Sequence, residues 1–248
     1  MYVKHSQLAL NYPDSARVWR YMDFSKFQNI ISHRALFFCR ADRFDDKWEG
    51  VFPLKMIEKF ELDNRRYPSV DGNTYTPCEW QMQKEARSHL INCWHANENE
   101  AFAMWKIYTE EKHPSIAVQS TVGRLKNSFN ETTDRIWIGE VEYIEFRNWE
   151  PDNRCFNVGS PNTLKAFFMK WHYFSYENEI RAVINRAYSE HKSENGIFVR
   201  TDLDELVENV CLSADTNREE EQRVRQLLEQ YSYSFPVQKS DLGISIYM

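Results

Sequence analysis

The sequence predicts an α+β fold in which a mixed or antiparallel central sheet is flanked by amphipathic helices. Strand-like and helical segments alternate irregularly, and some predicted strands lie close together in the chain. A doubly wound parallel sheet needs a regular alternation of strand and helix, so this pattern favours α+β. The chain has 248 residues, of which 42% are hydrophobic and 27% charged. This length and composition predict one globular domain over residues 1–248 with a large core.

The predicted strands are short segments rich in β-branched and aromatic residues. An irregular arm, residues 1–15, is expected to precede the first of them. The longest strand breaks its alternation near Gly139, which predicts a β-bulge. In chain order, the strands are 16–24, 35–41, 91–95, 115–120, 135–146, 178–185 and 196–200.

The predicted helices rest on apolar residues spaced three and four apart and on capping residues. The helix after Ser160 is expected to bury a stripe ending at Trp171, and the helix after Asp202 a stripe ending at Val210. The C-terminal helix is placed at 215–233. Start signals are expected at Ser25 with Gln28, at Thr121, at Ser160 with Pro161, at Asp202, and at Thr216 with Glu219. Further helices are predicted within 53–67, 79–91 and 99–110.

Charge and composition exclude several classes of protein. The net charge is −6, and no stripe of Lys and Arg could neutralise the phosphates of a duplex. A protein that modifies nucleic acid through one small pocket stays compatible with this charge. Glycine is scarce, with 7 in the chain, and no glycine-rich phosphate-binding loop is present.

Cysteine and histidine usage predicts neither disulfides nor a metal site. The five cysteines form no C-x-x-C motif, which indicates a reducing compartment. The histidines form no H-E-x-x-H motif and no close pair, so no metal ligand set is expected. The apolar runs are too short to span a bilayer. We therefore expect a cytoplasmic protein without a membrane partner.

The segment YENEIRAV, residues 176–183, is the best local signal for a functional site. On a strand, Glu177, Glu179 and Arg181 share one face, and neighbours on that face lie about 7 Å apart. Arg181 can then hold the carboxylate of Glu179 in place, as expected for a catalytic or ligand-binding glutamate. The alternative is a half-exposed strand whose salt bridges contribute little.

A second candidate is Arg20, which lies between Trp19 and Tyr21 on the first predicted strand. An arginine can bind a phosphate in bidentate fashion, and a neighbouring aromatic ring can stack on a flat base or pyridine ring. The alternative is that both rings pack in the core while Arg20 faces water. Tyr108 ends a helix whose other apolar residues should be core, so it is the member best placed to reach a cleft.

Three longer segments resemble a bacterial and phage-associated family known as domain of unknown function 2971. The resemblance runs from Val18 to the last helix, and it implies little about activity. Members of that family resemble proteins encoded near mobile elements and antiviral islands. This resemblance implies a role in defence and a protein partner encoded at the same locus. The segments are WRYMDFSKFQNIISHRALFFCRADRFDDKWEG, CWH…E…AMWKIYT…IAVQST and FFMKWHYFSYENEIRAVI.

The order of the motifs is also similar to that of ADP-ribosyltransferase-like folds, including DNA-modifying toxins of toxin–antitoxin pairs. The motifs in question are Arg20-Tyr21, then Tyr108 with Ser120-Thr121, then Glu177-x-Glu179. The Ser-Thr pair lacks the third serine of the S-T-S pattern. The resemblance implies an NAD-using transferase that modifies a macromolecule, either nucleic acid or protein.

The same resemblance implies roles for single residues. Arg20 would clamp the pyrophosphate of NAD, and Tyr21 or Tyr108 would stack on the nicotinamide. Glu179 would stabilise the charge that develops at the ribose, and Glu177 would position the acceptor. Arg181 is included in the predicted NAD-binding set.

Two other functions stay open from the sequence. The first is a non-catalytic sensor or binding protein of an antiviral defence system, in which the charged residues would be structural. The second is a metal-dependent nuclease, because such enzymes need paired carboxylates around a metal. An enzyme should bring its candidate residues into one concave pocket. The carboxylates available to a nuclease are Asp45, Asp46, Glu49, Glu177 and Glu179.

Overall fold

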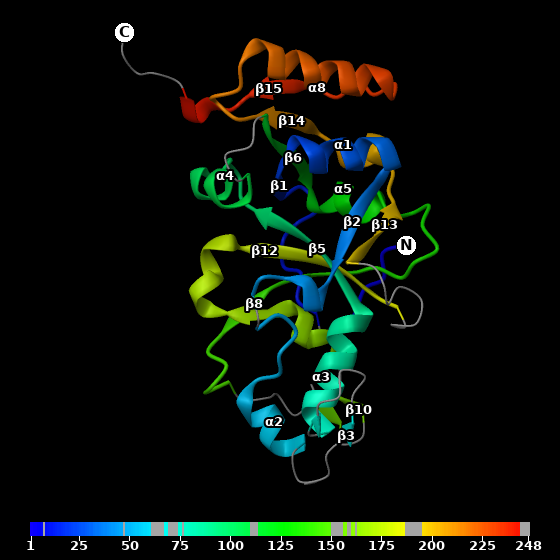
Figure 1. The fold of residues 1–248 in the computed structure, drawn as a ribbon, viewed down its shortest axis with the longest axis vertical. Coiled ribbons are helices and arrows are strands. Elements are labelled where there is room, and N and C mark those ends of the chain that lie inside the picture. Colours follow the sequence, from blue (N-terminus) through cyan, green and yellow to red (C-terminus); the bar gives the residue numbers. More distant parts are fainter. Residues whose placement is uncertain are drawn as a thin grey trace.

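The chain folds around a mixed, mostly antiparallel nine-stranded sheet with helices packed against it (Figure 1), which confirms the predicted α+β class. This arrangement is seen in a computed structural model. None of the helices in the described ranges is long and apolar enough to cross a membrane. The structure describes residues 1–6, 8–46, 48–60, 67–68, 74–75, 77–109, 114–149, 156–157, 160–161, 163–186 and 195–243.

The central sheet has the order β13-β2-β5-β1-β6-β14-β15, with β12 paired to β5 and β7 paired to β12. Strands β14 and β15 run parallel, and the other described pairs in this sheet are antiparallel. The strands are β1 (Arg17–Asp23), β2 (Ala35–Arg40), β5 (His89–Ala96), β6 (Ser115–Thr121), β7 (Trp137–Glu140), β12 (Glu179–Asn185), β13 (Gly196–Arg200), β14 (Asn209–Leu212) and β15 (Val237–Lys239).

Three smaller pairs of strands lie outside this sheet. Strands β8 (Glu142–Ile144) and β11 (Met169–Trp171) are parallel. The other two pairs are antiparallel: β3 (Tyr67–Pro68) with β4 (Thr74–Tyr75), and β9 (Phe156–Asn157) with β10 (Ser160–Pro161).

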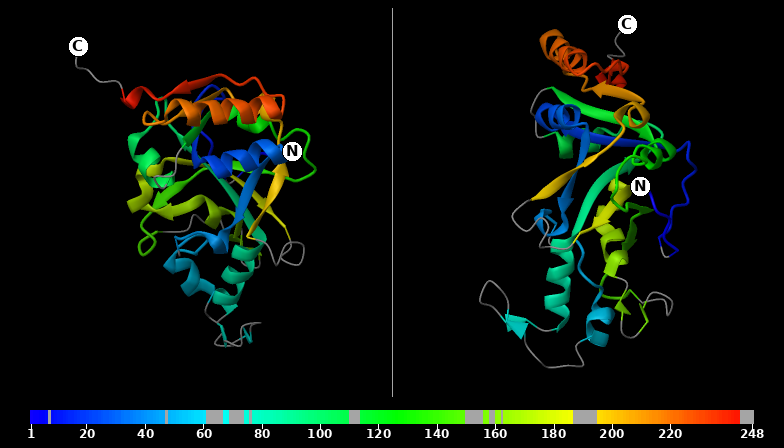
Figure 2. Two further views of the ribbon diagram at one scale, coloured as in Figure 1. Left: turned by 45° about the horizontal axis from the view of Figure 1, so that its top comes forward. Right: turned by 90° about the vertical axis from the view of Figure 1, so that its right-hand side faces the viewer.

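The helices lie at both ends of the molecule and against the sheet. Helix α8 and strand β15 lie at one end, and helices α2 and α3 project side by side at the other (Figures 1 and 2). The helices are α1 (Phe24–His33), α2 (Leu54–Phe60), α3 (Pro77–Ser88), α4 (Phe102–Tyr108), α5 (Val122–Asn127), α7 (Leu203–Leu206) and α8 (Arg218–Gln230). Short 3-10 segments are η1 (Ala41–Arg43), η2 (Thr163–Phe168), η3 (His172–Glu177) and η4 (Asp241–Gly243).

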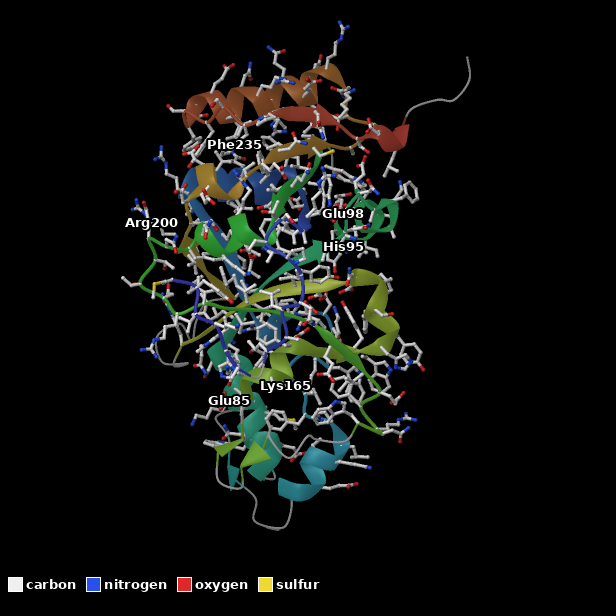
Figure 3. The ribbon with its side chains drawn as sticks, turned by 180° about the vertical axis from the view of Figure 1, so that it is seen from behind. Glu85, His95, Glu98, Lys165, Arg200 and Phe235 are labelled. Carbon is white, nitrogen blue, oxygen red and sulfur yellow. The ribbon has the colours of Figure 1, made fainter. Side chains whose placement is uncertain are left out.

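The main core lies between one face of the sheet and helices α1, α5 and α8. Phe27 of α1, Leu125 of α5 and Val224 of α8 are each fully buried in it. The apolar stripes predicted from three- and four-residue spacing in these helices are therefore confirmed. Phe235, labelled in Figure 3, packs against the same core beside the layer of α8 and β14.

The sheet is split, and this split positions the functional site. Strand β1 pairs with β6 along its whole length, but with β5 it pairs through Val18 and Trp19 alone in the described register. Strand β2 joins β5 through its last two residues, Cys39 and Arg40. From Arg20 onward, β1 therefore runs away from β5, and a wedge opens between β1, β5 and β2.

Two predicted helix starts are wrong by one or two residues. Asp23, not Ser25, is the N-cap of α1: its Oδ1 accepts hydrogen bonds from the Lys26 backbone N–H (2.8 Å) and from the Ser25 hydroxyl (2.6 Å). The capping box of α8 is Asn217 with Glu220, one residue after the predicted pair. In α1 the carboxylate is the stronger acceptor and takes the capping position. The caps predicted at Thr121 and Asp202 are confirmed.

Strand pairing overrides three other local predictions. The predicted strand 135–146 has no bulge at Gly139; it is divided at Val141, because β7 joins β12 while β8 joins β11. The helix expected after Ser160 is the 3-10 segment η2, and the residues predicted to start it form β10. The predicted stripes ended at Trp171 and Val210, but these residues lie in β11 and β14. Periodicity alone does not register such long-range pairing.

Candidate functional site

A cavity of about 570 Å³ lies in the wedge of the sheet, and we call it the site cavity. Apolar and aromatic side chains make up most of its wall, as is typical of ligand pockets. A few polar groups converge on it. His95, labelled in Figure 3, lies at the end of β5 on the side of α4. The polar side chains that the argument uses are Arg20, His95, Tyr108, Glu177 and Glu179.

Arg20 brings an uncompensated positive charge to this cavity. It lies on β1 just where that strand leaves β5, and within the described chain its guanidinium has no carboxylate partner. Its Nη1 is buried and has no hydrogen-bond partner among the described residues. Burial lowers the pKa of Arg20 to about 10. Arg20 as a whole is half-buried. Partial burial of a cation without a counterion is costly, so this group is suited to binding an anion that enters the cavity.

Glu179 contributes a carboxylate whose two oxygens are both held. Arg181 Nε donates to its Oε2 (2.6 Å), and Lys170 Nζ donates to its Oε1 (2.8 Å). The backbone N–H of Glu179 donates to the hydroxyl of Tyr143 (2.8 Å). Burial opposes ionisation of Glu179, but the charges of Arg181 and Lys170 outweigh it and hold its pKa well below the usual range. Glu179 is therefore a fixed negative charge at the cavity wall.

Glu177 lies beside Glu179, although not on the strand where it was predicted. It is the last residue of η3, and Asn178 follows with φ of 40°, so the chain turns sharply before β12 begins. Lys170 Nζ also donates to Glu177. Burial and the adjacent carboxylate of Glu179 raise the pKa of Glu177 to about 8. The two glutamates thus differ, one firmly ionised and one able to hold a proton near neutral pH.

Tyr108 reaches the cavity from the end of α4, while Met104 and Trp105 of the same helix are buried. Burial raises the pKa of its phenol, and so do the nearby carboxylates of Glu177 and Glu179. The position predicted for Tyr108 at the edge of a cleft agrees with this placement. Its hydroxyl is therefore next to the acidic pair.

Arg181 does not line the cavity. Its side chain is fully buried behind Glu179, and its other donors bind the carboxylate of Glu49 and the backbone carbonyl of Phe167 (2.8 Å). With these donors engaged, Arg181 holds Glu179 in place rather than contacting a ligand. Strand β12 is buried along nearly its whole length, so the alternative of a half-exposed salt-bridge ladder is wrong.

Tyr21 and His95 also line the site cavity. The Tyr21 hydroxyl accepts a hydrogen bond from the Ala101 backbone N–H (2.8 Å), and its ring packs edge-on against Trp105 at 5.0 Å. His95 Nδ1 bonds the backbone carbonyl of Glu177 (2.5 Å). A carbonyl can only accept, so Nδ1 carries a proton. Nε2 of His95 is buried without a partner among the described residues.

The structure brings Arg20, Tyr21, Tyr108, Glu177 and Glu179 to one cavity, and it leaves the predicted Ser-Thr pair outside. The Ser120 hydroxyl donates to the Leu206 carbonyl (2.6 Å), and Thr121 caps α5. Sequence reasoning did not assign a role to Lys170 or His95. No local pattern marks either residue, because their partners come from other elements.

The carboxylates suggested for a nuclease do not gather around an open position. Glu49 binds Arg181, and Lys170 binds both Glu177 and Glu179. Asp45 and Asp46 do not line the site cavity. Across the part of the chain that the structure describes, no three His, Cys, Asp or Glu side chains are grouped so that they could hold a metal ion.

Solved structures similar to this chain include those of DarT from Thermus sp. 2.9. The complex with NAD+ has a TM-score of 0.42 and 8% sequence identity, and covers 95% of this chain and 100% of that chain. The complex with ADP-ribosylated ssDNA has a TM-score of 0.41 and the same identity, and covers 94% and 97% of the two chains. The complex with carba-NAD+ has a TM-score of 0.39 at 8% identity, and covers 92% and 97%.

This similarity is a distant one of overall fold, so we derive the function from the side chains of the site cavity. No curated protein matches the sequence. No family model matches it either, so the resemblance to domain of unknown function 2971 has no support.

Proposed function

We propose that this protein is an ADP-ribosyltransferase-like enzyme that uses NAD to modify a macromolecule. One observation carries the proposal: a half-buried arginine, without a carboxylate partner among the described residues, and a pair of unlike glutamates line the same cavity. The first can bind a diphosphate, and the second suits chemistry in which positive charge develops at a sugar carbon.

The side chains of the site cavity match the chemical character of each part of NAD. Arg20 supplies the cation for the pyrophosphate, and its orphaned Nη1 supplies a donor for a phosphate oxygen. The rings of Tyr21 and Tyr108 supply apolar surface for the flat nicotinamide. A volume of about 570 Å³ lies within the range of pockets that bury such ligands.

The proposed reaction transfers the ADP-ribosyl group from nicotinamide to a nucleophile. The bond between the ribose C1′ and the nicotinamide nitrogen breaks, and the nicotinamide leaves with the bonding electrons. Glu179, held ionised by Lys170 and Arg181, stabilises the positive charge that develops at C1′. A bond then forms between C1′ and the acceptor heteroatom. The ionised form of Glu177 accepts the proton that the acceptor loses, and the raised pKa of this carboxylate makes it a stronger base.

The proposed acceptor is a nucleophilic group of a nucleic acid or a protein. The proposed setting, a bacterial defence or toxin–antitoxin system, follows from the resemblance of the motifs alone.

The test uses NAD labelled in its adenylate, with separate nucleic-acid and protein fractions of a cell lysate as acceptors. Wild type, Glu179→Gln and Arg20→Met are compared, with Glu229→Gln on the exposed face of α8 as the control. We expect Glu179→Gln to abolish label transfer and nicotinamide release while NAD binding persists. Arg20→Met should lose NAD binding itself.

The outcomes separate the proposed enzyme from its rivals. Binding of NAD without nicotinamide release in wild type would favour a non-catalytic sensor. Label transfer that survives in Glu179→Gln would contradict the role of that carboxylate. Calorimetry with Mn²⁺ tests the nuclease alternative, which requires metal binding that Glu179→Gln weakens.

A further inference from the structure

A second cavity, of about 560 Å³, lies on the face of β1, β6 and β14 opposite the main core, and we call it the acidic cavity. Trp19, Gln119 and Asn209 stand side by side on this face because they are register partners across the three strands. Glu98, labelled in Figure 3, belongs to the loop that follows β5 and forms part of the wall. The cavity carries four carboxylates, from Glu98, Glu100, Glu208 and Asp241.

The four carboxylates are not neutralised within the described chain. None of them belongs to an ion pair there. Two basic residues also line the cavity, but Arg17 directs its Nη1 to the backbone carbonyl of Glu98 (3.0 Å) rather than to a carboxylate. The other is Lys239 on the strand β15. Both oxygens of Glu100 already accept hydrogen bonds, from Trp105 Nε1 and from the backbone N–H of Asp241 (both 2.9 Å). The lining therefore has an excess of negative charge, and its free acceptors are those of the other carboxylates.

A chain of amides fixes the orientation of Asn209, a residue that lines this cavity. The carboxylate of Glu208 can only accept, so Gln119 turns its Nε2 toward it (3.3 Å) and its Oε1 toward Asn209. Asn209 must then donate from its Nδ2 to Gln119 Oε1 (3.4 Å). The Oδ1 of Asn209 therefore points away from Gln119. Asn209 is 7% exposed, and its Oδ1 is buried without a partner among the described residues. A buried acceptor without a donor is costly and suits a ligand that supplies one.

We propose that the acidic cavity binds an organic cation through a primary ammonium or guanidinium group. Both groups offer several N–H donors and a positive charge, which match the acceptors and carboxylates of the wall. The carboxylates are spread around the cavity, and no three of the described ones are grouped to hold a metal ion. The cation can come from a polyamine or from a Lys or Arg side chain of a partner protein. This inference is independent of the proposed NAD chemistry.

Trp19 forms part of the wall of both cavities. Its indole Nε1 donates to the Asn97 carbonyl (2.8 Å), which fixes the ring. The two sites are therefore adjacent but separate, and a carboxylate substitution in one should leave the other intact.

The test is calorimetric titration of the full chain with three probes in buffer of physiological ionic strength. The probes are spermidine, an acetylated and amidated tripeptide with a central arginine, and the same peptide with norleucine. We expect spermidine or the arginine peptide to bind, and the norleucine peptide not to bind. Glu208→Gln should weaken that binding about tenfold or more, because it removes a charge-assisted contact. Asn209→Leu should weaken it by a similar factor.

The control is Glu229→Gln, which removes a carboxylate from the exposed face of α8 and should leave the affinity unchanged. Thermal unfolding of each variant shows that it is folded. Binding of spermidine alone identifies a free polyamine, and binding of the arginine peptide alone identifies a protein side chain; both support the site. Absence of binding by both, or equal binding by wild type and Glu208→Gln, overturns it.

Discussion

At the scale of single residues, two arginines near the site cavity, Arg181 fully buried and Arg20 half-buried, have opposite relations to their surroundings. Arg181 lies between the carboxylates of Glu179 and Glu49. Arg20 has no such partner in the part of the chain that the structure describes, and burial lowers its pKa to about 10. The first charge is required by the fold, whereas the second is a cost to the fold that a ligand can offset.

This contrast predicts opposite effects on stability. Arg181→Met leaves the buried carboxylate of Glu49 without its cation and Glu179 with Lys170 alone, and should lower the free energy of unfolding by about 3–5 kcal/mol. That corresponds to a decrease in Tm of about 6–20 °C for a chain of this length. Arg20→Met removes an uncompensated charge and should leave Tm unchanged or raise it. Thermal unfolding followed by circular dichroism measures both, and a large loss of stability in Arg20→Met would show that Arg20 has an internal partner.

The raised pKa of Glu177 predicts a pH dependence of stability. Folded Glu177 holds its proton up to about pH 8, whereas its ordinary pKa is 4.5. Between these values the folded state binds more protons than the unfolded state, so the free energy of unfolding should fall as pH rises through the window. The groups that face Glu177 are Lys170 from β11, Glu179 from β12 and Tyr108 from α4.

The check is urea unfolding of wild type and Glu177→Gln at several values between pH 5 and pH 9. The difference between the two proteins should change through this window and level off above about pH 8. In Lys170→Met the fall should extend to higher pH, because the cation that favours the ionised carboxylate is absent. A constant difference between wild type and Glu177→Gln would mean that Glu177 titrates at its ordinary value.

At the scale of elements, the sequence predicts those strands whose signal is local. The strands around Arg20 and Glu179 are recognised because aromatic and β-branched residues fill them, and the structure has β1 and β12 there. Strand β14, by contrast, has four residues, and the spacing of its Val210 predicts the end of a helix stripe instead. Its pairing with β6 decides its state, and that pairing joins residues about 90 positions apart.

The residues of the candidate site likewise fall into those that the sequence predicts and those that it does not. A charged residue on an apolar strand is visible in the sequence, which is why Arg20 and Glu179 could be singled out. Arg181, two residues from Glu179 on the same strand, could also be predicted to hold its carboxylate. Lys170, and Glu49 behind Arg181, could not be predicted, because their contacts are long-range or cross a turn. Glu49 is 132 positions from Arg181, and Lys170 reaches the carboxylates from a different strand. Such contacts are fixed by the topology of the sheet and not by any periodicity of the chain.

Two substitutions at the start of α1 distinguish the predicted N-cap, Ser25, from the observed N-cap, Asp23. Asp23→Ala removes the acceptor of the Lys26 N–H and should lower stability by about 1 kcal/mol, or about 2–4 °C in Tm. Ser25→Ala is the matched control, because its hydroxyl only donates to Asp23 and should matter less. A larger effect of Ser25→Ala would show that the hydroxyl is the true cap.

At the scale of the whole molecule, one core cluster joins segments from both ends of the sequence. It includes Ala16 before β1 and Tyr233 after α8, with the central strands between them. The wedge that holds the site cavity is formed by strands of this same core. The site should therefore be lost together with the rest of the fold and not by separate unfolding of one part.

Leu228→Ala, in the last α-helix that the structure describes, tests whether the molecule unfolds as one unit. Leu228 is buried in the core on α8, and its truncation should cost about 2–5 kcal/mol and lower Tm by about 4–20 °C. Scanning calorimetry should show one transition, shifted as a whole, with calorimetric and van't Hoff enthalpies in agreement. Glu229→Gln, the exposed neighbour, should leave that transition in place. Two transitions, of which Leu228→Ala moves one, would mean that α8 and the layer beneath it unfold apart from the strands that carry Arg20 and Glu179.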